Sequence, residues 1–159
     1  MASTITSANL KVKITEEIIL NGRDQGSSNT LTIGSINEIS KRIVTVTTTE
    51  AEILKFHATD IDAGRYIIGD VRYMRFTNLD DTNFITLTFT NEDSDEVAIK
   101  LDAGQSFIWN GDNSNGMTAV FNATEDADAA SSTNFGSLTN IQADADTADC
   151  DLEILIASV

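Results

Sequence analysis

The sequence alternates apolar and polar residues over many short stretches. In residues 84–90, for example, Ile85, Leu87 and Phe89 alternate with threonines. A period of two is typical of a β-strand that buries one of its faces. This alternation, or a run of β-branched residues, predicts strands over residues 10–15, 31–33, 43–49, 52–57, 72–77, 84–90, 96–101, 105–109 and 150–157.

Polar turns separate these predicted strands. Asn21-Gly22 suits a tight hairpin turn because both residues tolerate a positive φ, and residues 78–83 and 91–95 are rich in Asn and Asp. No long amphipathic helix pattern occurs, and strands do not alternate with helices as they do in parallel-sheet enzymes. We therefore predict an all-β fold, an antiparallel, jelly-roll-like β-sandwich with eight or more strands and little helix.

The one-sided apolar faces of the clearest strands are the predicted core. Trp109, the single tryptophan, is expected in the core or at an interface. The apolar faces consist of Ile85, Leu87, Phe89, Val97, Ile99, Leu101, Leu152, Ile154 and Ile156.

A chain of 159 residues fits one domain of ordinary size. Residues 1–9 contain no charged side chain and lack the pattern of a signal peptide, so we interpret them as an N-terminal arm. Residues 10–159 are then a single β-sandwich domain. The polar stretch 111–149 is expected to be mostly loop, with short strands at 118–121 and 138–141 and a helical turn or loop at 123–131.

The formal net charge is −15, and every lysine and arginine lies in the first hundred residues. An acidic surface repels nucleic acid and anionic lipid, so neither nucleic acid nor a membrane is an expected partner. A single cysteine excludes an internal disulfide.

Candidate catalytic groups are few. The single histidine, His57, ends a predicted strand, and Cys150 lies between Asp149 and Asp151, whose charges disfavour a reactive thiolate. No nucleophile motif or phosphate-binding glycine loop is found. We therefore expect no catalytic residue and no cofactor, and we do not expect an enzyme.

Calcium is the one metal for which the sequence offers ligands. Asp144, Asp146, Asp149 and Asp151 fall within eight residues, and Ca²⁺ prefers carboxylate oxygens. Their spacing does not match the twelve-residue calcium loop with its central glycine. These four aspartates are weak calcium candidates beside the simpler interpretation of a solvated acidic loop.

Several segments resemble small β-sandwich structural proteins found in the virions of tailed bacteriophages of marine bacteria. The segments are KITEEIILNGRDQGSSN at 13–29, INEISKRIVTV at 36–46, VRYMRFTNLDDTNFITLTF at 71–89, IKLDAGQSFIW at 99–109 and the closing CDLEILIASV. The resemblance implies a virion protein made in the host cytoplasm, either a capsid decoration (cement) subunit or a tail-associated subunit. Its partners would be the major capsid protein or a tail protein.

Self-association is also expected, because a sandwich leaves sheet edges that subunit contacts can cover. The resemblance implies a trimer. Because residues 1–9 carry no charged side chain, they can lie on a neighbour at little electrostatic cost, and we expect them to be a contact between subunits or with the particle. The alternative is a tail- or fibre-associated module that binds a receptor or carbohydrate, with or without calcium. Aromatic residues make up only 6% of the chain, which disfavours a sugar-stacking site.

Overall fold

The computed structural model describes residues 5–59, 64–111 and 138–159. Two sheets form the body of the molecule, and all their strand pairs are antiparallel except β6 with β7. One sheet has the order β10-β9-β12-β6-β7, with bounds Glu96–Leu101, Ile85–Asn91, Leu138–Ala145, Ala51–His57 and Arg65–Ile67. The other has the order β11-β8-β13-β5, with bounds Ser106–Asn110, Val71–Asn78, Cys150–Ser158 and Glu38–Val46.

The expected all-β sandwich with at least eight strands is confirmed, and the described residues contain no helix. It follows that none of them forms a helix that could cross a membrane. The predicted strand at 138–141 is the first half of β12. The predictions for residues 118–121 and 123–131 lie outside the described residues.

The last two strands, β12 and β13, are consecutive in the chain and belong to different sheets, so the turn between them connects the two sheets. β12 lies between β9 and β6 in one sheet, and β13 lies between β8 and β5 in the other. The turn between them crosses the sandwich, where the Ala145 amide donates to the Thr47 carbonyl at 2.8 Å. The C-terminal apolar run is therefore paired on both sides, as β13 lies between β8 and β5.

The core lies between the sheets and contains the predicted faces. Seven of the nine predicted core residues are buried. Val97 and Ile99 are half-buried because they lie on β10, which has one neighbour among the described strands. Phe89 lies at the centre, with ring centroids 6.2 Å from Phe76, 5.7 Å from Phe107 and 5.2 Å from Trp109. Trp109 is a core residue.

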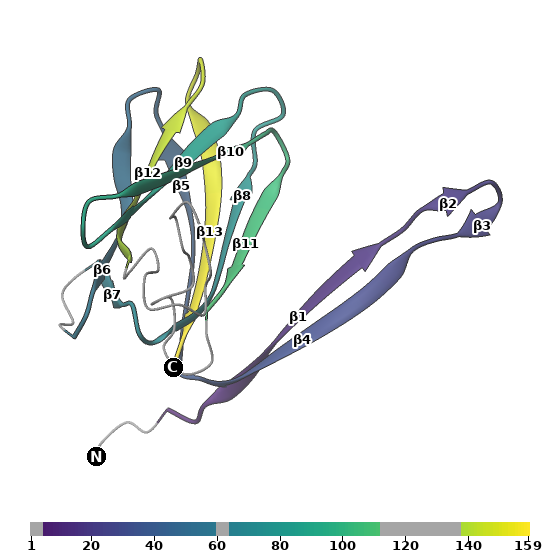
Figure 1. Cartoon of the computed structure of the whole chain (residues 1–159), viewed down its shortest axis with the longest axis horizontal. Helices are drawn as coiled ribbons and strands as arrows, with labels where there is room; N and C mark the ends of the chain where they lie inside the picture. The colour runs from purple at the N-terminus through teal and green to yellow at the C-terminus, as the bar shows by residue number, and fades with distance from the viewer. Residues whose placement is uncertain (1–4, 60–63, 112–137) are drawn as a thin grey trace.

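The first four strands form a separate hairpin. β1 (Ala8–Glu16) pairs with β4 (Ser27–Ile36), and β2 (Ile19–Leu20) pairs with β3 (Arg23–Asp24) at the far end. The predicted turn at Asn21-Gly22 is confirmed, with φ of 52° and 75°. Figure 1 shows this hairpin extending well away from the two sheets. We call residues 8–36 the arm from here on; the segment 1–9, which the sequence predicted to be an N-terminal arm, overlaps it only at Ala8 and Asn9. Its strands join neither large sheet, although the sequence alone assigned residues 10–36 to the sandwich domain.

Candidate interaction surface

The arm is a two-stranded ribbon with one apolar and one polar face. Residues directly opposite each other on paired strands share a face, and Val12 lies opposite Leu31. The apolar face of the arm therefore contains Leu10, Val12, Ile14, Leu31 and Ile33, followed toward the far end by the polar residues Asn29, Glu16 and Ser27. The polar face contains Lys11, Lys13, Thr15, Ser28, Thr30 and Thr32.

The base of the apolar face packs on the body. Ile33 and Ile36 are buried and form a small second core with Tyr73 and Ala157, on the outer face of the four-stranded sheet. The half-buried side chains around them are Leu10, Val12, Ile108, Leu155 and Val159. The Asn37 amide also donates to the Ser158 carbonyl at 2.9 Å. The arm is thus anchored near the C-terminus (Figure 1).

No residue of the described ranges covers the distal half of the arm in this way. Large apolar side chains there are strongly exposed: Ile14 45%, Leu31 43%, Ile18 52%, Ile19 77% and Leu20 58%. A two-stranded hairpin without further packing is only marginally stable in water. Several exposed large apolar side chains on one projecting element are typical of a protein interaction site.

Local contacts within the chain shape the arm's far end. The Gly26 amide donates to Asp24 Oδ1 at 2.8 Å, the Gln25 amide donates to the Ile18 carbonyl at 2.9 Å, and the Ser27 hydroxyl donates to a Glu16 carboxylate oxygen. At Gly26 the backbone passes so close to the Glu16 carbonyl that a Cβ would not fit. The far end of the arm is therefore held by specific hydrogen bonds, and it requires glycine at position 26.

Charge distinguishes the arm from the body. The arm carries three basic side chains, Lys11, Lys13 and Arg23, and three acidic ones. Its net charge is zero, so the whole net charge of −15 belongs to the rest of the chain. The arm can approach another acidic protein without the repulsion that two bodies would experience.

A second exposed apolar pair lies on β5, an edge strand with one neighbour. Ile39 and Ile43 are each 58% exposed, and Lys41 lies between them. Lys41 Nζ is 2.9 Å from Glu153 Oε2, and an Arg75 guanidinium nitrogen is 2.5 Å from Glu153 Oε1. The hydrogen bond from Lys41, assisted by Arg75, lowers the pKa of the Glu153 carboxyl.

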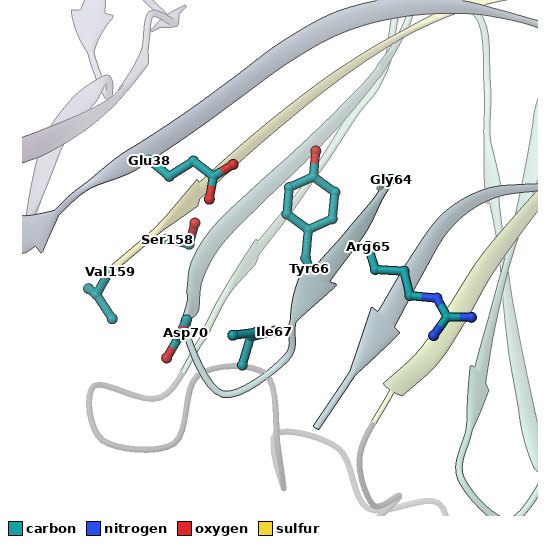
Figure 2. A pocket seen from close by; sticks show the side chains of 8 residues that line it. All are labelled: Glu38, Gly64, Arg65, Tyr66, Ile67, Asp70, Ser158 and Val159. Atoms are coloured by element: carbon teal, nitrogen blue, oxygen red, sulfur yellow. The ribbon is translucent and has the colours of Figure 1, made fainter. Parts of the chain in front are cut away.

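A cavity of about 350 Å³ lies beside the arm's base. Figure 2 shows the carboxylate of Glu38 directed toward the Tyr66 ring, while the Arg65 guanidinium points away from both. The other residues that line this cavity are Gly64, Ile67, Asp70, Ser158 and Val159. The lining therefore contains neither histidine nor cysteine.

The calcium candidates are spread along the β12–β13 hairpin. Asp144 is in β12, Asp146 and Asp149 are in the turn, and Asp151 is in β13. Asp151 accepts a hydrogen bond from Thr45 Oγ1 at 3.0 Å, and partial burial, helped by the charge of Glu50, raises the pKa of Asp144. Within the described ranges, no three His, Cys, Asp or Glu side chains gather as a metal site would require. The structure does not bring these aspartates together.

His57 and Cys150 lie at opposite ends of the sandwich. β6, which ends at His57, pairs with the beginning of β12, whereas Cys150 follows the end of β12. The His57 Nδ1 accepts a hydrogen bond from the Thr59 amide at 3.3 Å. Cys150 is buried, and that burial, together with nearby Asp80, raises the pKa of its thiol. The two side chains therefore do not form a nucleophile–base pair.

From the sequence alone, the expected contact segment was shorter than the arm. That segment is residues 1–9, of which residues 5–9 are described and exposed, with Ile5 at 69%. The longer arm that follows was not predicted. The available signal was the run Ile18–Leu20 directly before the Asn21-Gly22 turn, since three large apolar residues at a hairpin tip have no place in a solvated turn.

Comparison of the chain with protein-family models, with curated proteins and with solved structures finds no match in any of the three.

Proposed function

We propose that this protein is a structural subunit of a virion, a capsid-decorating protein held in its assembly by the arm. The observation that carries the proposal is the apolar face of the arm, which is left exposed over its distal half, including Ile14 and Leu31. An isolated ribbon of this kind gains most of its order from a partner. A building block of a larger particle has such a partner permanently available.

The composition of the body is consistent with the same role. Its acidic charge favours solubility before assembly, while the neutral arm supplies the contact. The described aromatic side chains are all buried or half-buried, which disfavours the open ring faces on which carbohydrate binding relies. The receptor- or carbohydrate-binding alternative therefore has less support.

A shortened arm provides the test. Lys13 and Thr30 are directly opposite each other, so residues 14–29 can be replaced by Asn-Gly to close a shorter hairpin in the same register. This variant keeps the packed base of the arm and the two sheets. We would produce the virus that encodes the chain with either version and examine purified particles by mass spectrometry and electron cryomicroscopy.

We expect the full chain in regular copies on the capsid surface and the shortened chain only in the soluble fraction. Purified particles that lack the full chain would overturn the virion role. Particles that carry the shortened chain as well as the full one would overturn the role of the arm.

A further inference from the structure

We propose that a basic cavity between the two sheets binds a small oxyanion, a phosphate or a carboxylate group. The cavity has a volume of about 360 Å³, and three basic side chains, Arg42, Lys55 and Arg65, line it together with one acidic side chain, Glu52. It is separate from the cavity of Glu38, although Arg65 borders both. This inference depends neither on the virion role nor on the arm.

Long-range strand pairing brings the three basic residues together. Arg42 is on β5, at the edge of the four-stranded sheet, and Lys55 and Arg65 are on β6 and β7 of the other sheet. Lys55 and Arg65 are direct partners in the parallel β6–β7 pair, so their side chains lie on the same face. β7 pairs with β6 only from Lys55 to His57. The preceding residues of β6 therefore have no neighbour on that side among the described strands, and they form one wall of the cavity.

Arg42 is held at the cavity by the backbone of β6. Its guanidinium group donates a hydrogen bond to the Ile53 carbonyl across the gap between the sheets. A guanidinium group has five N–H donors, so this bond leaves others that a ligand can use. The carbonyl is uncharged, so the bond fixes the position of Arg42 without neutralising its charge.

Lys55 is paired but keeps donors for a ligand. Its Nζ is 3.0 Å from Glu52 Oε1, and the two side chains remain 46% and 38% exposed. An ammonium group has three donors, of which this contact uses one. The guanidinium group of Arg65 points away from Glu38 in Figure 2, so it is not directed at the carboxylate of the neighbouring cavity.

This concentration of positive charge contrasts with the rest of the body. Ten lysines and arginines less the three in the arm leave seven elsewhere, and three of these seven line the cavity. Other basic side chains of the body are matched by carboxylates. Lys41 and Arg75 both contact Glu153, and Lys100 Nζ is 2.8 Å from Asp102 Oδ1. The cavity therefore attracts an anion at close range, whereas the acidic surface around it repels one.

The donors at the cavity match an oxyanion. Guanidinium groups bind carboxylate and phosphate oxygens in pairs, and an ammonium group adds a point charge beside them. A long polyanion such as nucleic acid would have to lie along the acidic body, which repels it, so the ligand is small. The same chemistry is available from a free phosphate ion and from an aspartate or glutamate side chain of a partner protein.

Nuclear magnetic resonance titration of the isotopically labelled full chain tests the site. Sodium phosphate is added while sodium chloride keeps the ionic strength constant, since charged surfaces respond to salt alone. We expect saturable shifts of the backbone amide signals of Ile53, Lys55 and Gly64. A parallel titration with sodium acetate probes the carboxylate source. Saturation by phosphate alone assigns the site to a phosphate group, saturation by acetate alone assigns it to a carboxylate, and either result supports an oxyanion site.

Two substitutions with opposite expected effects test the charge basis of binding. Lys55→Gln should raise the dissociation constant at least about fivefold, because one charge-assisted hydrogen bond is lost. Glu52→Gln should lower it at least about twofold, because it removes a negative charge from the lining and releases Lys55. Arg23→Gln is the matched control: it removes one positive charge from the arm, outside the cavity, and should change the constant by less than about twofold.

Several results would overturn the site. Shifts that do not saturate with either anion, or that are spread evenly over the surface of the body, show that no defined site exists. Equal dissociation constants for Lys55→Gln and the wild type would exclude this cavity as the place of binding. Weaker binding by Glu52→Gln than by the wild type would contradict the electrostatic attraction, since a variant that merely disturbs the fold has that effect.

Discussion

Val12 on β1 lies directly opposite Leu31 on β4, on the same face of the arm, yet Val12 is half-buried and Leu31 is 43% exposed. This pair marks the place where the body stops covering the ribbon. Below it, Leu10 and Ile33 pack over Tyr73 and Ala157. Above it, Ile14 lies opposite Asn29 and is 45% exposed, so the body's cover of the apolar face ends at this cross-strand pair.

Gly26→Ala should disturb the arm while sparing the body. A Cβ at this position would collide with the Glu16 carbonyl, so the end of the hairpin must rearrange. We expect faster amide hydrogen exchange in residues 16–27, with the free energy of unfolding of the body changed by less than about 0.5 kcal/mol. Gly69→Ala is the control, because a Cβ there meets open space. Equal exchange rates in Gly26→Ala and wild type would contradict the tight contact.

Phe89→Ala should lower the free energy of unfolding by about 3–5 kcal/mol. Phe89 is fully buried and contacts three aromatic rings from the facing sheet, so truncation leaves a cavity that these rings cannot readily fill. Urea denaturation followed by tryptophan fluorescence measures the change through Trp109. Ile43→Ala on the exposed face of β5 is the comparison and should change the free energy by about 0.5 kcal/mol or less.

Glu153 should contribute to the loss of stability in acid. Its pKa is lowered in the folded state by the hydrogen bond from Lys41 and by Arg75, so the ionised form is favoured by folding. The contribution is therefore complete above the unfolded pKa of about 4.3 and disappears as the pH falls through the lower folded value. Urea midpoints at pH 7 and pH 3 should differ less in Glu153→Gln than in the wild type. An identical pH dependence in the two proteins would show that the ion pairs have no effect.

The Cys150 thiol should be unreactive in the folded protein. It is 1% exposed, and its pKa is raised first by burial and then by the charge of Asp80, so little thiolate forms near neutral pH. Ellman's reagent should label the native chain only at the rate of unfolding and should label it at once in urea. Thr30→Cys adds an exposed thiol on the arm and should label immediately in the native state. Fast native labelling of the wild type would contradict the burial.

Removal of divalent cations should leave the melting temperature unchanged. The structure spreads the four candidate aspartates along one hairpin, and Asp151 already accepts a hydrogen bond from Thr45. Differential scanning fluorimetry with EDTA and with calcium tests this directly. A shift of several degrees between the two conditions, abolished by Asp146→Asn, would establish a calcium site at this turn.

Local patterns in the sequence determined where the strands lie and which of their faces are apolar. Ile85, Leu87 and Phe89 could be assigned to one buried face because side chains alternate along any strand. The Asn21-Gly22 turn could be predicted because its positive φ angles depend on the two residues themselves. Both properties arise from neighbours in the chain, so the sequence contains them completely.

Only the tertiary structure decided what covers each apolar face. Leu10, Val12 and Ile14 show the same alternation as Ile85, Leu87 and Phe89, yet one strand runs out into the arm and the other crosses the core. The difference depends on which distant strands pair: β12 and β13 occupy inner positions of the two large sheets, whereas β1 and β4 pair only with each other. Alternation specifies that a face needs a partner, but long-range pairing decides whether that partner is the chain's own body or another molecule.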